Sequence, residues 1–83
     1  MIFKVELVVK PKTGVRDPQG DAVGDAITGI GVKGVTVHHV GRFLAMDIEA
    51  ASADAARAVV DDLCKRLLVN PNLETYSASV EGV

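Results

Sequence analysis

The hydrophobic period of the chain changes at Asp17-Pro18, and this junction constrains the fold more than any other feature of the sequence. Before it, apolar residues alternate with polar ones, as in a half-buried strand; they are Phe3, Val5, Leu7 and Val9. After it, apolar residues recur every three or four positions, as on one side of a helix; they are Ala22, Val23, Ala26, Ile27 and Ile30. Asp17 suits the N-cap and Pro18 the first helical position. The sequence therefore predicts a strand, a loop and a helix that ends at the glycines from Gly29 onward.

The rest of the chain continues the alternation of strands and helices. We expect a strand over Val35–Val40, a tight reversal or bulge at Gly41-Arg42, a strand over Leu44–Glu49, a helix over Ala53–Leu68 after the cap Ser52, and a strand over Leu73–Glu81. The order is β-α-β-β-α-β, which is typical of a ferredoxin-like α+β domain. We therefore predict a two-layer sandwich, an antiparallel sheet with two helices on one face, as one domain over residues 1–83.

Charge and length exclude several classes of protein. A net charge of -2 argues against nucleic-acid binding, which needs a basic surface. No apolar run approaches the roughly 20 residues of a membrane-spanning helix, and the N-terminus alternates where a signal peptide has an apolar core, so we expect a cytoplasmic protein. Eighty-three residues form a small core, while 48% of the residues are hydrophobic. Some apolar surface is therefore expected to meet another chain.

Three motifs with possible chemistry are better explained structurally. Gly29–Gly34 has the letters of a dinucleotide-binding loop, but it follows a helix instead of a strand, so a left-handed helix ending is the better interpretation. His38 and His39 are adjacent on an expected strand and point to opposite faces, so they cannot share a metal. Cys64 lies late in a helix beside its apolar side, which favours a packed thiol over a nucleophile. We expect no catalytic residue, metal site or cofactor on this chain.

Three stretches of the sequence resemble the PurS family, the small subunit of phosphoribosylformylglycinamidine synthase. They are Val15–Val23 with its Asp17-Pro18-Gln19-Gly20, Val40–Glu49, and Leu63–Pro71 followed by Leu73–Tyr76. Together they cover nearly the whole chain in the family's order. Two features are not assumed to belong to the family pattern, namely the turn Gly29–Gly34 and the pair His38-His39.

The resemblance implies a role in de novo purine synthesis. The family's complete enzyme converts formylglycinamide ribonucleotide, glutamine, ATP and water to formylglycinamidine ribonucleotide, glutamate, ADP and phosphate, and it uses magnesium. In that family PurL carries the ATP-dependent site and PurQ the glutaminase. The PurS subunit is a non-catalytic scaffold that pairs with itself, as a homodimer or tetramer, and bridges the other two subunits so that ammonia can pass between them.

Six residues are predicted to line the contacts with partners: Asp17, Pro18, Gln19 and Gly20 at the helix start, and Gly41 and Arg42 at the reversal. Because Arg42 is expected at a turn, outside both apolar stripes, its replacement by alanine should weaken assembly more than stability. Two alternatives stay open at this stage. One is a ferredoxin-like domain that senses an amino acid or nucleotide at a subunit interface, and the other is a small enzyme acting alone.

Overall fold

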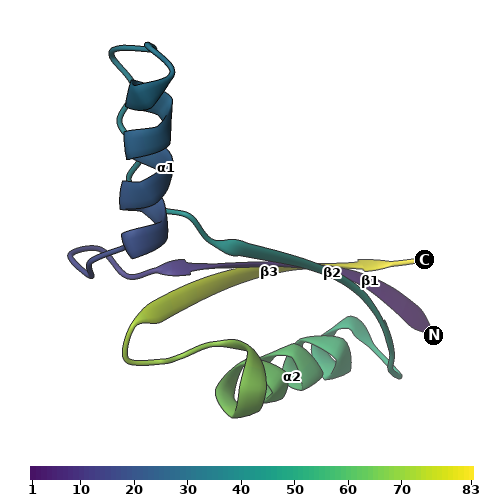
Figure 1. The fold of residues 1–83 in the computed structure, drawn as a ribbon. Helices are drawn as coiled ribbons and strands as arrows, with labels where there is room; N and C mark the ends of the chain where they lie inside the picture. The colour runs from purple at the N-terminus through teal and green to yellow at the C-terminus, as the bar shows by residue number, and fades with distance from the viewer.

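The computed structural model describes all 83 residues, which form one three-stranded sheet, two α-helices and a short π-helix (Figure 1). In chain order the elements are β1 (Ile2–Pro11), α1 (Pro18–Gly29), β2 (Arg42–Glu49), α2 (Ala53–Leu63), the π-helix η1 (Cys64–Leu68) and β3 (Glu74–Gly82). No helix is both long enough and apolar enough to cross a membrane.

The sheet is antiparallel in the order β2-β1-β3, so β1 is the central strand. Val5 illustrates the register, because it lies opposite Met46 on one side and Val80 on the other. The predicted alternation in β1 is confirmed, since its odd-numbered apolar residues are all at most 4% exposed; they are Phe3, Val5, Leu7 and Val9. The even-numbered side chains lie on the opposite face of the sheet, which we call the open face.

Helix α2 covers the buried face of the sheet. Its predicted N-cap is confirmed, since the Ser52 side chain accepts a hydrogen bond of 3.1 Å from the Ala55 amide. Ala56 and Val60 of α2, and Cys64 at the start of η1, place the apolar side of this helical segment in the core. The predicted Ala53–Leu68 helix is also confirmed in extent, but its last turn widens into η1, which closes with a bond of 3.2 Å from the Val69 amide to the Cys64 carbonyl.

Helix α1 has the predicted ends but not the predicted position. Pro18 begins it and Asp17 caps it, while Gly31 and Gly34 turn the chain with φ values of 88° and 79°, in the left-handed region that glycine favours. However, α1 rises on the side of the sheet opposite α2 and does not lie on the sheet (Figure 1). The expectation of two helices on one face is therefore wrong for α1. A physical reason is that α2 already covers the apolar face, whereas α1 offers mostly alanine and glycine for packing.

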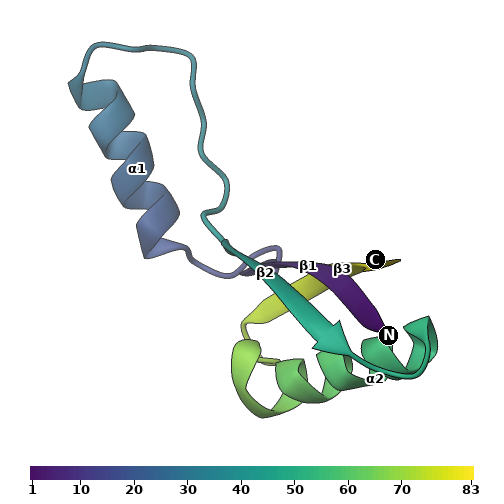
Figure 2. The same cartoon turned by 90° about the vertical axis from the view of Figure 1, so that its right-hand side faces the viewer.

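The strand expected over Val35–Val40 is not formed within the chain, so the sheet has three strands where four were predicted. The reversal expected at Gly41-Arg42 is also absent. The chain returns from α1 in an extended conformation and runs on into β2, which begins at Arg42 (Figure 2). Because α1 stands away from the sheet, the returning segment has no free strand edge beside it. The α+β class, the antiparallel sheet and the other three strands are confirmed.

The molecule is elongated as a result. We call residues 18–40, which comprise α1 and the returning segment, the arm. The remaining chain forms the body. The Cα radius of gyration is 16.2 Å, with extents of 51 × 27 × 15 Å. A compact domain of this length has a radius of about 12 Å.

Candidate partner-binding site at the base of the arm

Asp17 joins the two chain segments that meet at the base of the arm. Its Oδ1 accepts a hydrogen bond of 3.1 Å from the Gly20 amide, and its Oδ2 accepts one of 2.7 Å from the Val40 amide. The Nδ1 atom of His39 lies 3.9 Å from Oδ2. The bond from Val40, followed by that from Gly20, lowers the pKa of the Asp17 carboxyl below its usual value. One carboxylate therefore caps α1 and fixes the point where the returning segment re-enters the body.

The residues after Asp17 divide into one buried and two exposed positions. Gly20 is the only buried residue of α1, and a Cβ atom there would come within 3.2 Å of the Asp17 carboxylate. Glycine at this position therefore leaves space for the cap. Pro18 and Gln19 are exposed and line a hollow that extends to Leu73 and Glu74 of the body.

Gly41 lies where the returning segment crosses the end of β1. A Cβ atom built on Gly41 would overlap the carbonyl oxygen of Val9. The φ of Gly41 is not positive, so the position requires glycine for close approach and not for an unusual backbone angle. Its role in this chain is steric, and the predicted tight reversal is not the reason for it.

Arg42 connects three elements of the body. Its guanidinium donates two hydrogen bonds to the Glu74 carboxylate, of 2.9 and 3.1 Å, and one of 2.7 Å to the Leu68 carbonyl at the end of η1. The Glu74 carboxylate also accepts a bond of 2.9 Å from the Asn70 amide. The Arg42 bonds, followed by the Asn70 bond, lower the pKa of Glu74. Arg42 is thus the residue at which β2 begins, and its side chain links β2 to η1 and β3. The prediction that it lies at a free turn is wrong.

The six predicted contact residues therefore gather at the base of the arm but differ in accessibility. Asp17, Gly20 and Gly41 hold the local geometry. Pro18 and Gln19 face solvent, and Arg42, with a side chain 54% exposed, does so in part. Their contact with partners stays a prediction. The structure adds Glu74 to this group, because it lines the same hollow as Pro18 and binds Arg42. Sequence reasoning missed Glu74, since 32 residues separate it from Arg42 and no local pattern links them.

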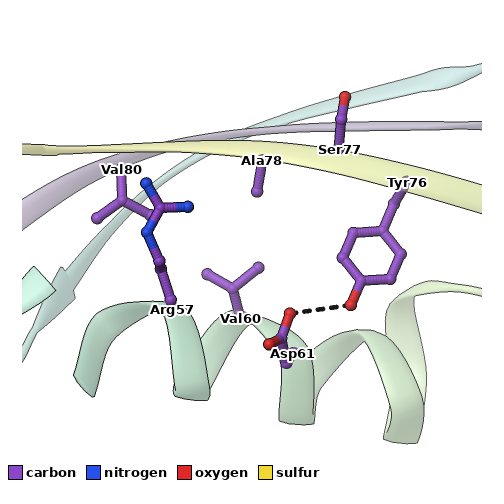
Figure 3. A pocket seen from close by; sticks show the side chains of 7 residues that line it. All are labelled: Arg57, Val60, Asp61, Tyr76, Ser77, Ala78 and Val80. Carbon is purple, nitrogen blue, oxygen red and sulfur yellow. Dashed lines mark hydrogen bonds between the residues drawn. The ribbon is translucent and has the colours of Figure 1, made fainter. Parts of the chain in front are cut away.

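A second polar group, also missed from the sequence, lies between α2 and β3 (Figure 3). The Tyr76 hydroxyl donates a hydrogen bond of 2.9 Å to Oδ1 of Asp61, and this bond raises the pKa of Tyr76. Arg57 and Val80 line the other end of the hollow. The only available signal was the alternation that places Tyr76, Ala78 and Val80 on one face of a strand. The hydrogen bond occupies the Asp61 carboxylate, so the group holds α2 against β3.

The other residues considered for chemistry have structural roles in packing or in turning the chain. Cys64 is 1% exposed, and burial raises the pKa of its thiol, so the prediction of a packed thiol is confirmed. His39 lies against Asp17, and no three His, Cys, Asp or Glu side chains are placed to hold a metal ion together. Gly31 and Gly34 turn the chain after α1, as predicted.

The fold and the site define a small α+β subunit with a compact body and an extended arm. The polar residues of the site form hydrogen bonds between segments of the same chain. The sequence matches the family model PurS, phosphoribosylformylglycinamidine (FGAM) synthase, over residues 4–82, so the chain belongs to the PurS family of FGAM synthase subunits.

Relatives and solved structures agree with this family. The chain is 33% identical to subunit PurS of Bacillus subtilis over 82 residues, which cover 99% of this chain and 96% of that protein. It is 33% identical to the Archaeoglobus fulgidus subunit PurS over 72 residues, which cover 87% and 90%. The crystal structure of B. subtilis PurS superimposes with a TM-score of 0.85 at 32% identity, covering 96% and 99%. A chain in the structure of PurLQS from Thermotoga maritima gives 0.85 at 28% identity, covering 96% and 98%.

Proposed function

We propose that this chain is the non-catalytic subunit that bridges a PurL-type synthetase and a PurQ-type glutaminase in the cytoplasm. The observation that carries the proposal is the likeness to a chain of PurLQS from T. maritima across almost the whole length of both chains. The curated relatives support a PurS subunit and not the alternative of a free-standing small-molecule sensor. The polar side chains of Asp17, Arg42 and Tyr76 form hydrogen bonds within the chain. This fits a subunit that acts by binding its partners and not by supplying reactive groups.

The chemistry gives such a bridge a purpose. Glutamine hydrolysis releases ammonia at one active site, and the synthetase consumes it at another, together with formylglycinamide ribonucleotide and ATP. Free ammonia is protonated or lost in water, so a closed path between the sites conserves the nucleophile. ATP and magnesium belong to the synthetase in this proposal, and this chain supplies no ligand for either.

The base of the arm is the proposed contact surface for the two partners. Pro18 and Gln19 are accessible there, and Arg42 and Glu74 form a charged pair beside them. Charged groups at the rim of an interface orient partners more than they add affinity. The bonds of Asp17 to Gly20 and Val40 keep these accessible residues in a fixed arrangement.

Reconstitution of the synthetase tests the proposal. Purified PurL-type and PurQ-type subunits are assayed with and without this chain, using either glutamine or ammonium chloride as the nitrogen source. We expect glutamine-dependent formation of formylglycinamidine ribonucleotide to require this chain, whereas ammonia-dependent formation proceeds without it. Equal glutamine-dependent turnover in its absence would refute the proposed bridge.

A variant pair locates the contact. Gln19→Ala changes an exposed residue at the base of the arm, and Asp54→Ala changes an exposed residue at the start of α2, remote from it. We expect the first to weaken pull-down of the two larger subunits and the second to leave it unchanged. Equal effects would place the contact elsewhere on the surface.

A further inference from the structure

Strand β3 forms the edge of the sheet opposite β2, and its outer side pairs with no other strand. The Val83 amide, directly after β3, donates a bond of 3.1 Å to the Ile2 carbonyl, so the odd-numbered residues of β3 direct their backbone groups toward β1. The even-numbered residues direct theirs outward; they are Tyr76, Ala78 and Val80. These outward backbone groups have no hydrogen-bond partner within the chain. An unpaired edge of this kind can accept an extended peptide as an added strand.

The helical segment formed by α2 and η1 presents a row of charged side chains beside β3. Arg57, Asp61 and Lys65 follow one another at intervals of four residues, so they lie along one side of this segment. Arg57 and Asp61 line the hollow between α2 and β3, and the Arg57 side chain reaches toward Val80 (Figure 3). Lys65 lines a second hollow, which extends to Tyr76. The charged row therefore runs along β3.

The two cations of this row have no anionic partner. Neither Arg57 nor Lys65 forms an ion pair within the chain, although the chain carries more acidic than basic residues. Asp61 lies between them in the row, and its carboxylate accepts the Tyr76 hydroxyl at 2.9 Å. The row therefore offers two free positive groups on either side of a carboxylate that is already hydrogen-bonded.

The spacing of the two cations matches the repeat of an extended strand. Eight residues of helix span about 12 Å, and four residues of strand span about 13 Å. Arg57 lines the same hollow as Val80, and Lys65 shares the other hollow with Tyr76, four residues earlier in β3. On an added antiparallel strand, the residues opposite Val80 and Tyr76 direct their side chains to the same face of the sheet as these two residues. Those side chains therefore meet the two cations.

We propose that the outer edge of β3 binds an extended acidic segment of another protein as an added antiparallel strand. The segment carries two carboxylates four residues apart, one against Arg57 and one against Lys65. The residue midway between them is uncharged, because it lies opposite Ala78, above the hollow of about 170 Å³ that Asp61 also lines. Main-chain hydrogen bonds to the edge supply affinity, and the two cations supply specificity. This surface is separate from the base of the arm, so the proposal does not rest on the bridge between synthetase and glutaminase.

An acidic segment fits this edge better than the β3 strand of a second copy. The side chains that β3 directs toward α2 between Tyr76 and Val80 include no carboxylate, so a second β3 supplies no anion for either cation. Antiparallel pairing of two such edges about a two-fold axis sets Asp61 against its own copy and Arg57 against Lys65. Like charges then face each other, which is unfavourable.

The test titrates the isotopically labelled full chain with an acetylated and amidated peptide, Thr-Glu-Thr-Val-Thr-Glu-Thr, followed by NMR. We expect the amide signals of Tyr76, Ala78 and Val80 to shift, and those of Phe43 and Ala45 on the outer edge of β2 to stay in place. A peptide with glutamine at both glutamate positions should bind about 5- to 20-fold more weakly. N-methylation of the central valine, which removes its bond to the edge at Ala78, should weaken binding about 5-fold. N-methylation of the preceding threonine, whose amide points away from the edge, should not.

Variants of the chain provide the matched comparison. Arg57→Gln and Lys65→Gln should each weaken binding of the glutamate peptide about 3-fold. Arg66→Gln removes the same charge from an exposed residue that pairs with Asp62 and lines neither hollow, so it should leave binding unchanged. Equal effects of the three variants, equal binding of the glutamine peptide, or no shift at millimolar peptide would overturn the proposal. Shifts at the β3 edge that depend on protein concentration without peptide would assign the edge to a second copy and would also overturn it.

Discussion

The body and the arm use the same kinds of element with opposite results. In the body, α2 packs on the sheet, and the core is formed by buried residues of both layers, namely Ala56, Val60, Cys64, Ile48, Phe3, Val5, Leu7 and Val9. In the arm, α1 is one residue longer than α2 but buries only Gly20. Helical stability in proteins comes mainly from packing an apolar side and not from intrinsic propensity. The body is therefore stable by its own contacts, whereas the arm is tied to the body by the hydrogen bonds of the Asp17 carboxylate with Gly20 and Val40.

Truncating an apolar side chain should show the largest difference in stability between the body and the arm. Leu7 is fully buried in the centre of β1. Leu7→Ala should lower the free energy of unfolding by about 2–5 kcal/mol, since it leaves a cavity in the core. The matched arm variant, Val23→Ala, removes an apolar side chain that is 42% exposed, and it should change that free energy by less than about 0.5 kcal/mol. Urea denaturation followed by circular dichroism measures both. Similar losses would show that α1 is packed as firmly as α2.

Two glycine-to-alanine variants sharpen the comparison at the junction of the regions. Gly41→Ala forces a methyl group into the carbonyl of Val9, so we expect a loss of about 1–3 kcal/mol in unfolding free energy. Gly24→Ala lies in the partly exposed interior of α1, where an added Cβ atom meets no atom within 4 Å, and it should gain up to about 1 kcal/mol from better helix propensity. Thermal melts of the two variants should therefore shift in opposite directions. A stabilised Gly41→Ala would mean that the arm can cross β1 farther away.

The sequence was sufficient for the elements whose signals are local. The alternation in β1, the Asp17-Pro18 start of α1 and the Ser52 cap of α2 each depend on residues within one element, and each prediction is confirmed. The position of α1 depends on which surface the helix packs against. The periodicity of α1 shows that it has an apolar side but not where that side binds, so the placement was wrong.

The site illustrates the same limit. The sequence predicts Asp17 as a helix cap, but its bond to Val40 spans 23 residues and has no signature in the sequence. The sequence predicts Arg42 at a turn that does not form, and its partner Glu74 lies 32 residues away. The strand expected over Val35–Val40 has the correct composition but no partner in the chain. A strand pattern records the tendency to pair, and it is silent on which chain supplies the other strand.

Replacing Arg42 tests whether its hydrogen bonds between β2, η1 and β3 serve only to stabilise the body. Arg42→Ala removes the paired bonds to Glu74 and the bond to the Leu68 carbonyl. Because the arginine side chain is 54% exposed, solvent screens the pair and we expect a loss of only about 1 kcal/mol in unfolding free energy. Arg66→Ala is the control, since Arg66 has a longer contact of 3.5 Å with Asp62 and is 76% exposed; it should change stability less.

A pull-down with Arg42→Ala tests the sequence-based prediction that this replacement weakens assembly more than stability. Pull-down of the larger subunits by the same protein shows whether the variant loses affinity beyond its loss of stability. A change in stability with unchanged pull-down would restrict Arg42 to its role inside the chain.

Low pH should weaken the attachment of the arm to the body. Of the changes predicted here, this one should have the smallest effect on the free energy of unfolding. The pKa values of Asp17 and Glu74 are both lowered in the folded chain. A carboxyl with a lowered folded pKa contributes stability that is fully present above its unfolded pKa, about 4, and is lost as pH falls through the lower folded value. Stability should therefore be flat above about pH 5 and fall below about pH 4. Asp17→Asn keeps the size of the side chain but removes this titration, so the variant should show a shallower fall, measured by urea denaturation between pH 3 and pH 7 in steps of roughly half a unit. An unchanged slope would show that the Asp17 carboxylate does not hold the arm in solution, and that the two regions are coupled mainly through the close contact of Gly41 with β1.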